Sequence, residues 1–298
     1  MLSVILIFTV SPKPLRMRIC KDKKTGKRCL HYISVVWTLL FFFTGSQAYA
    51  QQPTKYYWEN GKLKSEGMLD AAGKLDGFWA FYYESGVKKS EGFYNHGKAE
   101  KAWFFWDMNG KLASRGFYKN DQLDSAWIFF QPDGHVWKMC FYKNNLLDGA
   151  HVEWWNDTLM KEAGTYRKGL KHGTWTTWYP ACQVKSQQVF VDGKVNGDYL
   201  LWHENGVLQT SGEVMNDKSE GEWKFWDRQG KLLTVGNYHL GQWHGLWTDY
   251  KDNGKRLAAG HFNMNKKTGR WRYWNEEGKI RKLEIYKDEK LFKEISYE

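Results

Sequence analysis

Histidine is the residue type of this chain that could most readily bind a metal ion. His239 and His244 are separated by four residues, and His96 and His172 occupy predicted turns. A zinc site needs three or four ligands, and no cysteine or acidic residue accompanies these histidines at a suitable spacing. We therefore expect solvated turn histidines, no bound metal and no cofactor.

Cys140 and Cys182 are the two cysteines outside residues 1–50. They are separated by nearly two of the repeat units described below, which places their strands roughly 15–20 Å apart in an antiparallel meander. A disulfide needs Cα atoms within about 7 Å of each other. The sequence therefore predicts two free thiols.

A pair of carboxylates in a cleft would indicate glycoside hydrolysis. The acidic side chains recur instead at one turn position of the repeat, which is typical of a solvated edge; they include Glu100, Asp124, Asp148 and Glu220. The chain has no G-x-S-x-G nucleophile motif and no glycine-rich phosphate loop followed by a helix. We expect a protein without enzymatic activity.

An internal repeat of 24 residues determines where these side chains lie. A tryptophan or a substitute recurs at that interval, and a second aromatic column follows three residues later. The first column comprises Trp79, Trp103, Trp127, His151, Trp175, Tyr199, Trp223, Trp247 and Trp271. Nine units fill residues 77–292 without an insertion, and a longer unit precedes them. A period of this length indicates a repeat architecture.

Each unit has the pattern of two strands and two turns. Aromatic and β-branched residues favour strands, and glycine recurs too often for a helix. Turns such as Asn109-Gly110 and Asn205-Gly206 supply the positive φ that hairpins require. Stacked hairpins can bury the faces that a single hairpin cannot. We predict an all-β fold: an elongated antiparallel β-meander of about ten 24-residue β-hairpin repeats in a single-layer twisted sheet.

Residues that break the repeat are the candidates for function. His151 replaces a tryptophan, and glycine columns are broken at Lys101, Ser125, Cys140, Thr158, Cys182, Gln188 and Glu284. Apart from Glu284, every break lies between residues 101 and 188.

Three tryptophans, Trp137, Trp155 and Trp243, lie outside the aromatic columns. Trp137 and Trp155 occupy mostly polar columns on consecutive predicted strands, and the intervening turn places them roughly opposite each other. We hypothesise that they form an exposed pair with His151 and Tyr179 nearby, as a binding patch. The alternative is neutral drift with local repacking.

Residues 1–50 have the features of an export signal. A basic stretch, 21–28, precedes an apolar run from Ile33 to Thr44 and the triplet Ala48-Tyr49-Ala50. This order is typical of a secretory signal peptide, cleaved here before Gln51. The alternative is a membrane anchor, but the run is shorter than the roughly 20 residues needed to span a bilayer. Met1 and Met17 are both candidate start residues.

The domain assignment follows from these two features. Residues 1–50 form an N-terminal extension with the signal peptide, and residues 51–298 form the repeat domain. The repeat units start near residues 53, 77, 101, 125, 149, 173, 197, 221, 245 and 269.

The formal net charge of +11 arises mainly in the signal region. Eight of the 44 Lys and Arg residues and one of the 33 acidic residues precede residue 51, so that 36 basic and 32 acidic residues remain, a net charge of +4. Nucleic-acid-binding domains usually concentrate far more charge. We expect no nucleic-acid partner.

The patterns G-x-W-x-x-[YW]-x-x-x-G and [SE]-x-G-x-[YF]-x-x-G-K resemble the MORN-variant repeats (membrane occupation and recognition nexus) over essentially residues 55–292. The resemblance implies a single-layer β-sheet that acts as a binding scaffold, and it carries no catalytic residue. Bacterial relatives are often labelled antitoxins, a label that fits an exported protein poorly. Eukaryotic relatives suggest contact with phospholipids or proteins.

The sequence thus predicts an exported, monomeric scaffold, periplasmic or extracellular, that binds a protein or surface ligand through an aromatic β-face. One alternative is an antitoxin-like partner of a toxin. Another is a module that binds polysaccharide through its exposed tryptophans, or an anionic membrane surface through lysines such as Lys266 and Lys267.

Overall fold

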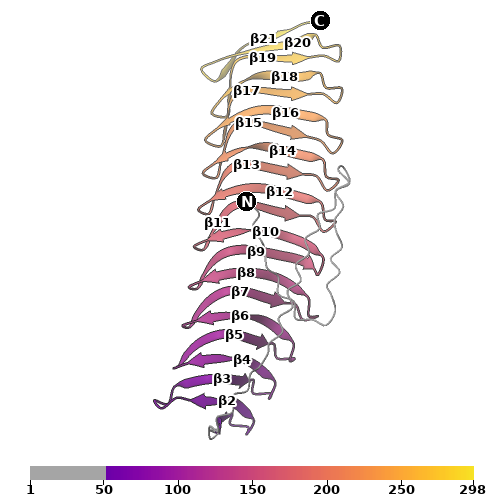
Figure 1. The fold of residues 1–298 in the computed structure, drawn as a ribbon. Coiled ribbons are helices and arrows are strands. Elements are labelled where there is room, and N and C mark those ends of the chain that lie inside the picture. The colour runs from indigo at the N-terminus through magenta and orange to yellow at the C-terminus, as the bar shows by residue number, and fades with distance from the viewer. Residues whose placement is uncertain (1–51) are drawn as a thin grey trace, which may run out of the picture. The chain divides into compact units, whose positions relative to one another are not determined.

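The computed structural model describes residues 52–298, and the predicted signal peptide lies outside the described residues. The described part consists of 21 β-strands joined by short turns (Figure 1). No helix within it is long and apolar enough to cross a membrane. The predicted all-β architecture of hairpin repeats is confirmed.

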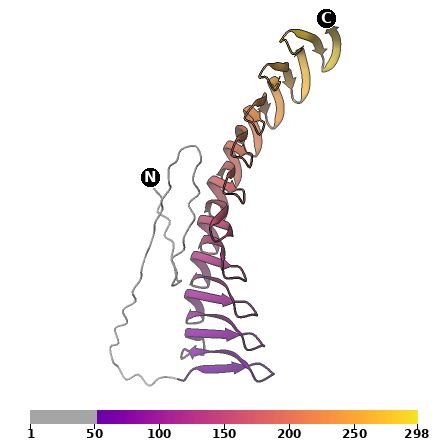
Figure 2. The same cartoon turned by 90° about the vertical axis from the view of Figure 1, so that its right-hand side faces the viewer.

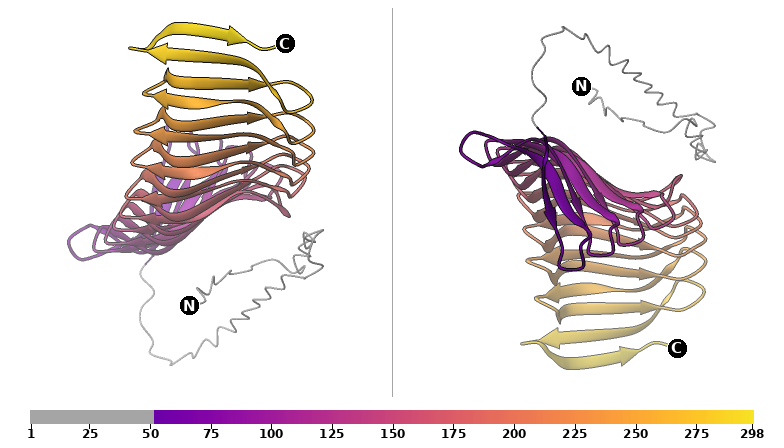
Figure 3. Two further views of the ribbon diagram at one scale, coloured as in Figure 1. Left: turned by 90° about the horizontal axis from the view of Figure 1, so that it is seen from above. Right: turned by 90° about the horizontal axis from the view of Figure 1, so that it is seen from below.

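The described residues divide into two compact units, with the boundary between Leu159 and Met160. Within each unit, every strand is antiparallel to the next strand along the chain, which makes each an open meander (Figures 1 and 3). The strands of the first unit are β1 (Thr54–Tyr57), β2 (Leu63–Leu69), β3 (Leu75–Tyr82), β4 (Lys88–Asn95), β5 (Lys98–Trp106), β6 (Leu112–Lys119), β7 (Gln122–Phe130), β8 (Val136–Lys143) and β9 (Leu146–Asn156).

The second unit contains the remaining strands, of which β10 begins one residue before the boundary. They are β10 (Leu159–Arg167), β11 (Leu170–Trp178), β12 (Val184–Val191), β13 (Lys194–Trp202), β14 (Leu208–Met215), β15 (Lys218–Trp226), β16 (Leu232–His239), β17 (Gln242–Tyr250), β18 (Arg256–Asn263), β19 (Lys266–Trp274), β20 (Ile280–Lys287) and β21 (Lys290–Ser296).

Two kinds of turn alternate along the chain, one at each end of the strands (Figure 2). The predicted Asn-Gly turns are three-residue loops: Asp107 N donates to Lys111 O at 2.8 Å, and Gly110 has a φ of 76°. The other turns have two residues, both with positive φ, such as Asn120 at 49° and Asp121 at 64°. Asn and Asp tolerate this conformation better than other side chains do, so these tight turns form without an Asn-Gly pair.

The two-residue turns are linked to the strand of the preceding hairpin. Asp121 N donates to Ala99 O at 3.0 Å, and Ala99 N donates to Asp121 Oδ1 at 2.5 Å. The same reciprocal pair joins Asp217 to Val195, at 3.0 and 2.8 Å. These bonds fix the backbone beside the aromatic rings described below.

Each unit buries tryptophans on one face of its sheet, which we call the Trp face. In the first unit it carries Trp79, Trp103 and Trp127, which are 1–5% exposed. Side chains alternate between the faces of a strand, so the second aromatic column, which includes Trp106, lies on the opposite face. The predicted aromatic ladders on both faces are consistent with this arrangement.

Every buried ring of this type lies flat on a glycine of the preceding strand. A Cβ atom added to Gly116 would lie 2.1 Å from the Trp127 ring, and one added to Gly92 would lie 2.2 Å from Trp103. Trp127 Nε1 also donates to Phe117 O at 3.1 Å, one residue beyond the glycine. The repeat therefore couples a glycine to a tryptophan, and the coupled pairs are Gly67 with Trp79, Gly92 with Trp103, Gly116 with Trp127, Gly164 with Trp175, Gly212 with Trp223, Gly236 with Trp247, and Gly260 with Trp271.

This coupling explains three breaks in the repeat. Cys140 replaces a glycine, and the residue opposite it is His151 instead of tryptophan. Gln188 likewise lies opposite Tyr199. A side chain at the glycine position leaves no room for the indole ring, so the two positions change together.

The breaks at Lys101, Ser125 and Cys182 concern the backbone instead. Their φ angles are 61°, 57° and 68°, the left-handed conformation of the glycines that they replace. The local structure of the repeat is kept at these positions, so the breaks themselves do not mark a separate site.

Candidate functional site

The residue four positions before each tryptophan of the Trp face covers the ring when its side chain is long. Lys171 Nζ lies 3.7 Å from the centroid of the Trp175 ring, and the centroids of Trp243 and Trp247 are 5.2 Å apart. We call this repeat position the plug position. Its residues are Leu75, Ala99, Leu123, Leu147, Lys171, Val195, Ser219, Trp243, Lys267 and Leu291.

Two cavities occur where the plug residue is small. The first, of about 330 Å³, lies in the first unit beside Ala99 and Trp103. The second, of about 400 Å³, lies in the second unit beside Val195, Ser219 and Trp223. A short side chain at the plug position therefore leaves a hollow on the Trp face.

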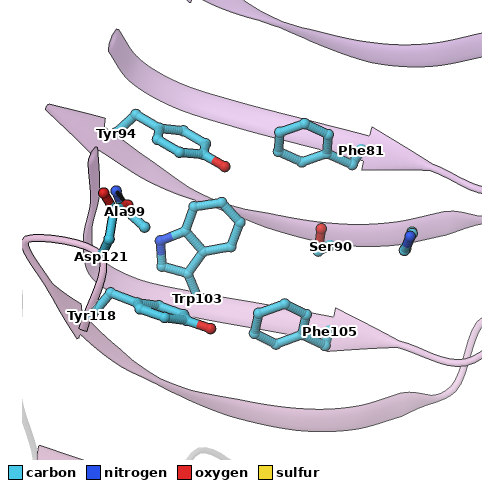
Figure 4. A pocket seen from close by; sticks show the side chains of 9 residues that line it. Phe81, Ser90, Tyr94, Ala99, Trp103, Phe105, Tyr118 and Asp121 are labelled. Carbon is cyan, nitrogen blue, oxygen red and sulfur yellow. Dashed lines mark hydrogen bonds between the residues drawn. The ribbon is translucent and has the colours of Figure 1, made fainter. Parts of the chain in front are cut away.

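The cavity in the first unit, which we call the Trp103 pocket, has aromatic walls (Figure 4). The rings of Tyr94 and Tyr118 stand edge-on to Trp103, with centroid distances of 5.1 and 5.8 Å. Phe81 and Phe105 lie nearly parallel to the indole, at 6.3 and 5.9 Å. Figure 4 shows the two tyrosine rings on either side of Trp103, with their hydroxyls pointing towards the phenylalanine side.

The rim of the Trp103 pocket is polar. It carries Lys89 and the carboxylate of Asp121, and the buried Ser90 lies in the lining. Burial, followed by the negative charge of Asp121, raises the pKa of Tyr94 and of Tyr118. Both phenols therefore stay protonated at neutral pH and can donate a hydrogen bond to a guest. The pocket combines aromatic surface with hydroxyl donors and one acidic group.

The structure places Trp137 on the Trp face of the first unit, at a β-bulge. Lys138 pairs with Phe129 and Val136 with Phe130, so Trp137 is the extra residue of β8. Its ring lies 6.0 Å from Phe129. Trp137 thereby extends the aromatic row that contains Phe105 and Trp127.

The sequence predicted that Trp137 and Trp155 lie roughly opposite each other, and the strand register gives their relative position. Lys138 pairs with Glu153, so Trp137 faces position 154 and Trp155 lies one residue further along β9. Trp155 is 45% exposed, whereas His151 is buried at 6%. A shift of one residue moves a side chain to the other face of a strand. Trp155 thus lies one residue beyond the position that faces Trp137, and the predicted binding patch stays a prediction.

Tyr179 and Trp243 belong to the second unit. The Tyr179 hydroxyl donates to Trp202 O at 3.0 Å, which links two consecutive hairpins. Trp243 is a plug residue that is 40% exposed, and its Nε1 donates to the Tyr238 hydroxyl at 3.1 Å. Trp243 packs between Trp247 and Phe262, so packing accounts for its departure from the aromatic columns.

Sequence reasoning missed Tyr94, Trp103 and Tyr118 as site residues, because they fit the repeat and were assigned to packing. The signal that could have found them is the plug position. It holds a long side chain in most repeats, and Ala99 is the smallest residue in that column.

The described residues contain no group of three or more histidine, cysteine or acidic residues that could hold a metal ion. His239 Nδ1 lies 2.8 Å from Glu220 Oε1, and the His239 and His244 ring centroids are 5.7 Å apart. Cys140 and Cys182 are both free thiols, as predicted, and burial raises the pKa of Cys140.

Each of the two lysines considered for membrane binding has an acidic partner. Lys266 is paired with Glu289, and Lys267 Nζ lies 3.3 Å from Glu284 Oε2. Binding of an anionic membrane surface by these lysines stays a prediction.

The carboxylate that pairs with Lys267 belongs to Glu284, whose side chain is 8% exposed. Burial disfavours its charge, but hydrogen bonds from Lys282 Nζ and Tyr273 Oη, each 2.6 Å long, and the charge of Lys267 outweigh this effect. Together they lower the pKa of Glu284 from 4.5 to about 2. Ionised Glu284 therefore stabilises the folded state above pH 4.5, and this contribution is lost as the pH falls towards 2.

We expect Glu284→Gln to lower the melting temperature at pH 7 and to flatten its dependence on pH between 5 and 2. The neutral amide keeps the shape of the side chain but loses its charge-assisted bonds, at a cost of about 2 kcal/mol. Glu276→Gln, at a side chain that is 81% exposed, is the matched control. Parallel melting curves for Glu284→Gln and the wild type across this pH range would contradict the assignment.

Comparison with known families finds a match to the MORN repeat variant at five places, residues 53–70, 75–96, 99–120, 219–239 and 267–288. The resemblance stated from the sequence is confirmed at these repeats, and the second and third of them together contain all the residues of the Trp103 pocket except Asp121. No curated protein matches the chain.

Among solved structures, the chain is similar to parts of Tc toxin complexes. TcdB2–TccC3 is 12% identical over 79% of this chain and 18% of that chain, with a TM-score of 0.18. The Photorhabdus luminescens Tc holotoxin pore with a mutated TccC3 is 13% identical over 79% of this chain and 16% of that chain, again at 0.18. This chain thus spans less than a fifth of those chains, and TM-scores this low establish no relationship of fold or function.

Proposed function

We propose that this chain, five of whose repeats match the MORN repeat variant, is a non-enzymatic scaffold that binds a protein partner through the Trp face of its first unit. The observation that supports this proposal is the Trp103 pocket. Interface residues that dominate binding are often tyrosines, tryptophans and arginines in pockets that exclude water. The pocket offers two tyrosines and a tryptophan, Tyr94, Tyr118 and Trp103, which a partner could cover on binding.

The surroundings of the pocket extend this surface. Rings follow one another from Trp103 through Phe105, Trp127 and Phe129 to Trp137, with successive centroids 5.9 to 6.3 Å apart. The phenylalanines and Trp137 are half-buried, so they can pack against an extended segment of the partner. Rigid rings on a β-sheet lose little conformational entropy on binding, which favours affinity.

We further propose that the protein acts outside the cytoplasm, in the periplasm or beyond the cell, after cleavage near Ala50. The support for export is the order of basic, apolar and small residues in the first fifty positions. N-terminal sequencing of the secreted or periplasmic protein tests this part separately, and an intact N-terminus in the cytoplasm would contradict it.

The binding proposal can be tested by affinity capture from an extract of extracellular and cell-surface proteins. Ala99→Leu fills the Trp103 pocket with the residue that Leu75 and Leu123 place at the same repeat position. We expect this variant to retain at least tenfold less partner than the wild type. Ser219→Leu, which fills the cavity of the second unit in the same way, is the matched control and should capture as the wild type does.

Equal capture by the wild type and Ala99→Leu would contradict the proposal. Trp155→Ala belongs in the same experiment, because a loss with this variant alone would place the site at the tryptophan patch predicted from the sequence. Release of the captured protein by a soluble polysaccharide would favour the carbohydrate-binding alternative.

A further inference from the structure

The Trp103 pocket has a counterpart in each repeat whose plug residue is lysine. Lys171 Nζ lies 3.7 Å from the Trp175 centroid and 5.4 Å from the Phe190 centroid. Trp175 and Phe190 occupy the same repeat positions as Trp103 and Tyr118. The chain itself therefore places an ammonium group in the space that is open beside Ala99.

The second example is Lys267. Its Nζ atom lies 4.6 Å from the centroid of Trp271, 5.5 Å from Tyr273 and 5.6 Å from Tyr286. These three residues stand at the positions of Trp103, Phe105 and Tyr118. The faces of aromatic rings carry negative electrostatic potential and attract a cation at these distances. Two independent repeats thus show the same preference.

Each of these lysines also has an acidic partner. Glu162 Oε2 lies 3.3 Å from Lys171 Nζ, and Glu284 Oε2 lies 3.3 Å from Lys267 Nζ. In the Trp103 pocket, Asp121 supplies the negative charge at the rim. Lys89 is the basic residue of the lining, and its Nζ lies 5.7 Å from the centroid of the Tyr83 ring.

Ala99 removes the internal lysine but keeps the rings around it. Trp103 is only 4% exposed, so a guest contacts mainly the half-buried rings of Tyr94 and Tyr118, with the indole as the floor. The volume of about 330 Å³ is sufficient for the end of a long side chain. In the second unit, Val214 stands at the position of Tyr94, so the cavity beside Ser219 lacks one of the tyrosine walls.

We propose that the Trp103 pocket binds the ammonium group of a lysine side chain that the partner presents. That a protein partner presents the lysine depends on the proposed function. The preference of the pocket for a cation depends on this chain alone. The ring faces attract the charge, Asp121 balances it, and the tyrosine hydroxyls can accept hydrogen bonds from the ammonium group.

The preference can be measured with Nα-acetyl-lysine amide and its neutral isostere Nα-acetyl-norleucine amide. The two compounds are titrated into the full-length protein, and the ring resonances of Tyr94 and Tyr118 are followed by NMR. We expect the lysine compound to bind about fivefold more tightly, as a cation–π contribution at a partly exposed site implies. Equal affinity for the two compounds would overturn the proposal.

Ala99→Lys provides the sharper test, because it copies the native arrangement of Lys171 and Lys267. Its own ammonium group should occupy the pocket and weaken binding of Nα-acetyl-lysine amide at least tenfold. Leu147→Lys places the same residue at the plug position two repeats further on and should leave the titration unchanged. Undiminished binding by folded Ala99→Lys would overturn the proposal, and if this variant does not fold, Ala99→Leu takes its place.

The outcomes also separate this inference from the proposed function. Loss of partner capture by Ala99→Leu, together with equal affinity for the two small compounds, would disprove the lysine preference and leave the scaffold function standing. A clear preference for the lysine compound, together with unchanged capture by Ala99→Leu, would disprove partner binding at the Trp103 pocket and leave the lysine preference standing.

Discussion

Gly116→Ala is expected to lower the free energy of unfolding by about 3 kcal/mol, because the new Cβ atom would lie 2.1 Å from the Trp127 ring. The indole must then leave its place and lose the 3.1 Å hydrogen bond from Nε1 to Phe117 O. Chemical denaturation followed by tryptophan fluorescence and circular dichroism measures the effect.

A second substitution at position 127 should rescue part of the stability that is lost by a substitution at Gly116. The chain holds Cys140 opposite His151 where other repeats hold glycine opposite tryptophan. Gly116→Cys combined with Trp127→His should therefore be more stable than Gly116→Cys alone, with a coupling energy of about 2 kcal/mol in a double-mutant cycle. Additive effects of the two substitutions would contradict the steric coupling.

Tyr94→Ala combined with Tyr118→Ala is expected to weaken binding of the captured partner by about 100-fold, equivalent to about 3 kcal/mol. Both walls of the Trp103 pocket are then removed, and with them the rings that the guest contacts. Isothermal titration calorimetry with the purified partner gives the affinity, and circular dichroism shows whether the variant is folded.

The second unit offers a matched control for this variant. Tyr238 occupies the repeat position of Tyr118, and its ring lies 5.7 Å from Trp223. Tyr238→Ala removes the same side chain from the second unit, and we expect it to bind the partner as the wild type does. A comparable loss of affinity with Tyr238→Ala would mean that the first unit is not the specific site.

The repeat architecture could be predicted from the sequence because its period is regular. Aromatic residues at fixed intervals and glycines at the turns define strands and hairpins without any tertiary information. Gly110, for example, has the positive φ that its Asn-Gly pair indicated. The two-residue turns, such as Asn120-Asp121, were less evident because their residues differ from one repeat to the next.

The candidate site could not be predicted in the same way. Departures from the repeat, such as Cys140 with His151, are explained by steric coupling between neighbouring strands, which is invisible in a single column of the repeat. Ala99 departs only in size from the leucines and lysines at its repeat position. In the structure, Lys171 lies over the Trp175 ring. Comparison with that repeat shows that the equivalent space beside Trp103 is open because Ala99 is too short to fill it.

The register of β8 and β9 is a second example. The number of residues in a turn decides which side chains face each other, and an irregularity between Cys140 and Tyr142 shifts the β8–β9 pairing beyond the turn. Bulges depend on backbone geometry that the composition of a strand does not specify. The position of Trp155 relative to Trp137 therefore required the structure.

Site-specific photocrosslinking tests the central claim, that the partner binds at the Trp103 pocket, most directly. Lys89 lies at the rim of the pocket, and Lys185 occupies the same repeat position in the second unit. With p-benzoylphenylalanine in place of one lysine at a time, we predict a crosslinked adduct with the captured partner from position 89 and none from position 185. An adduct from position 185 alone, or equal adducts from both positions, would contradict the claim.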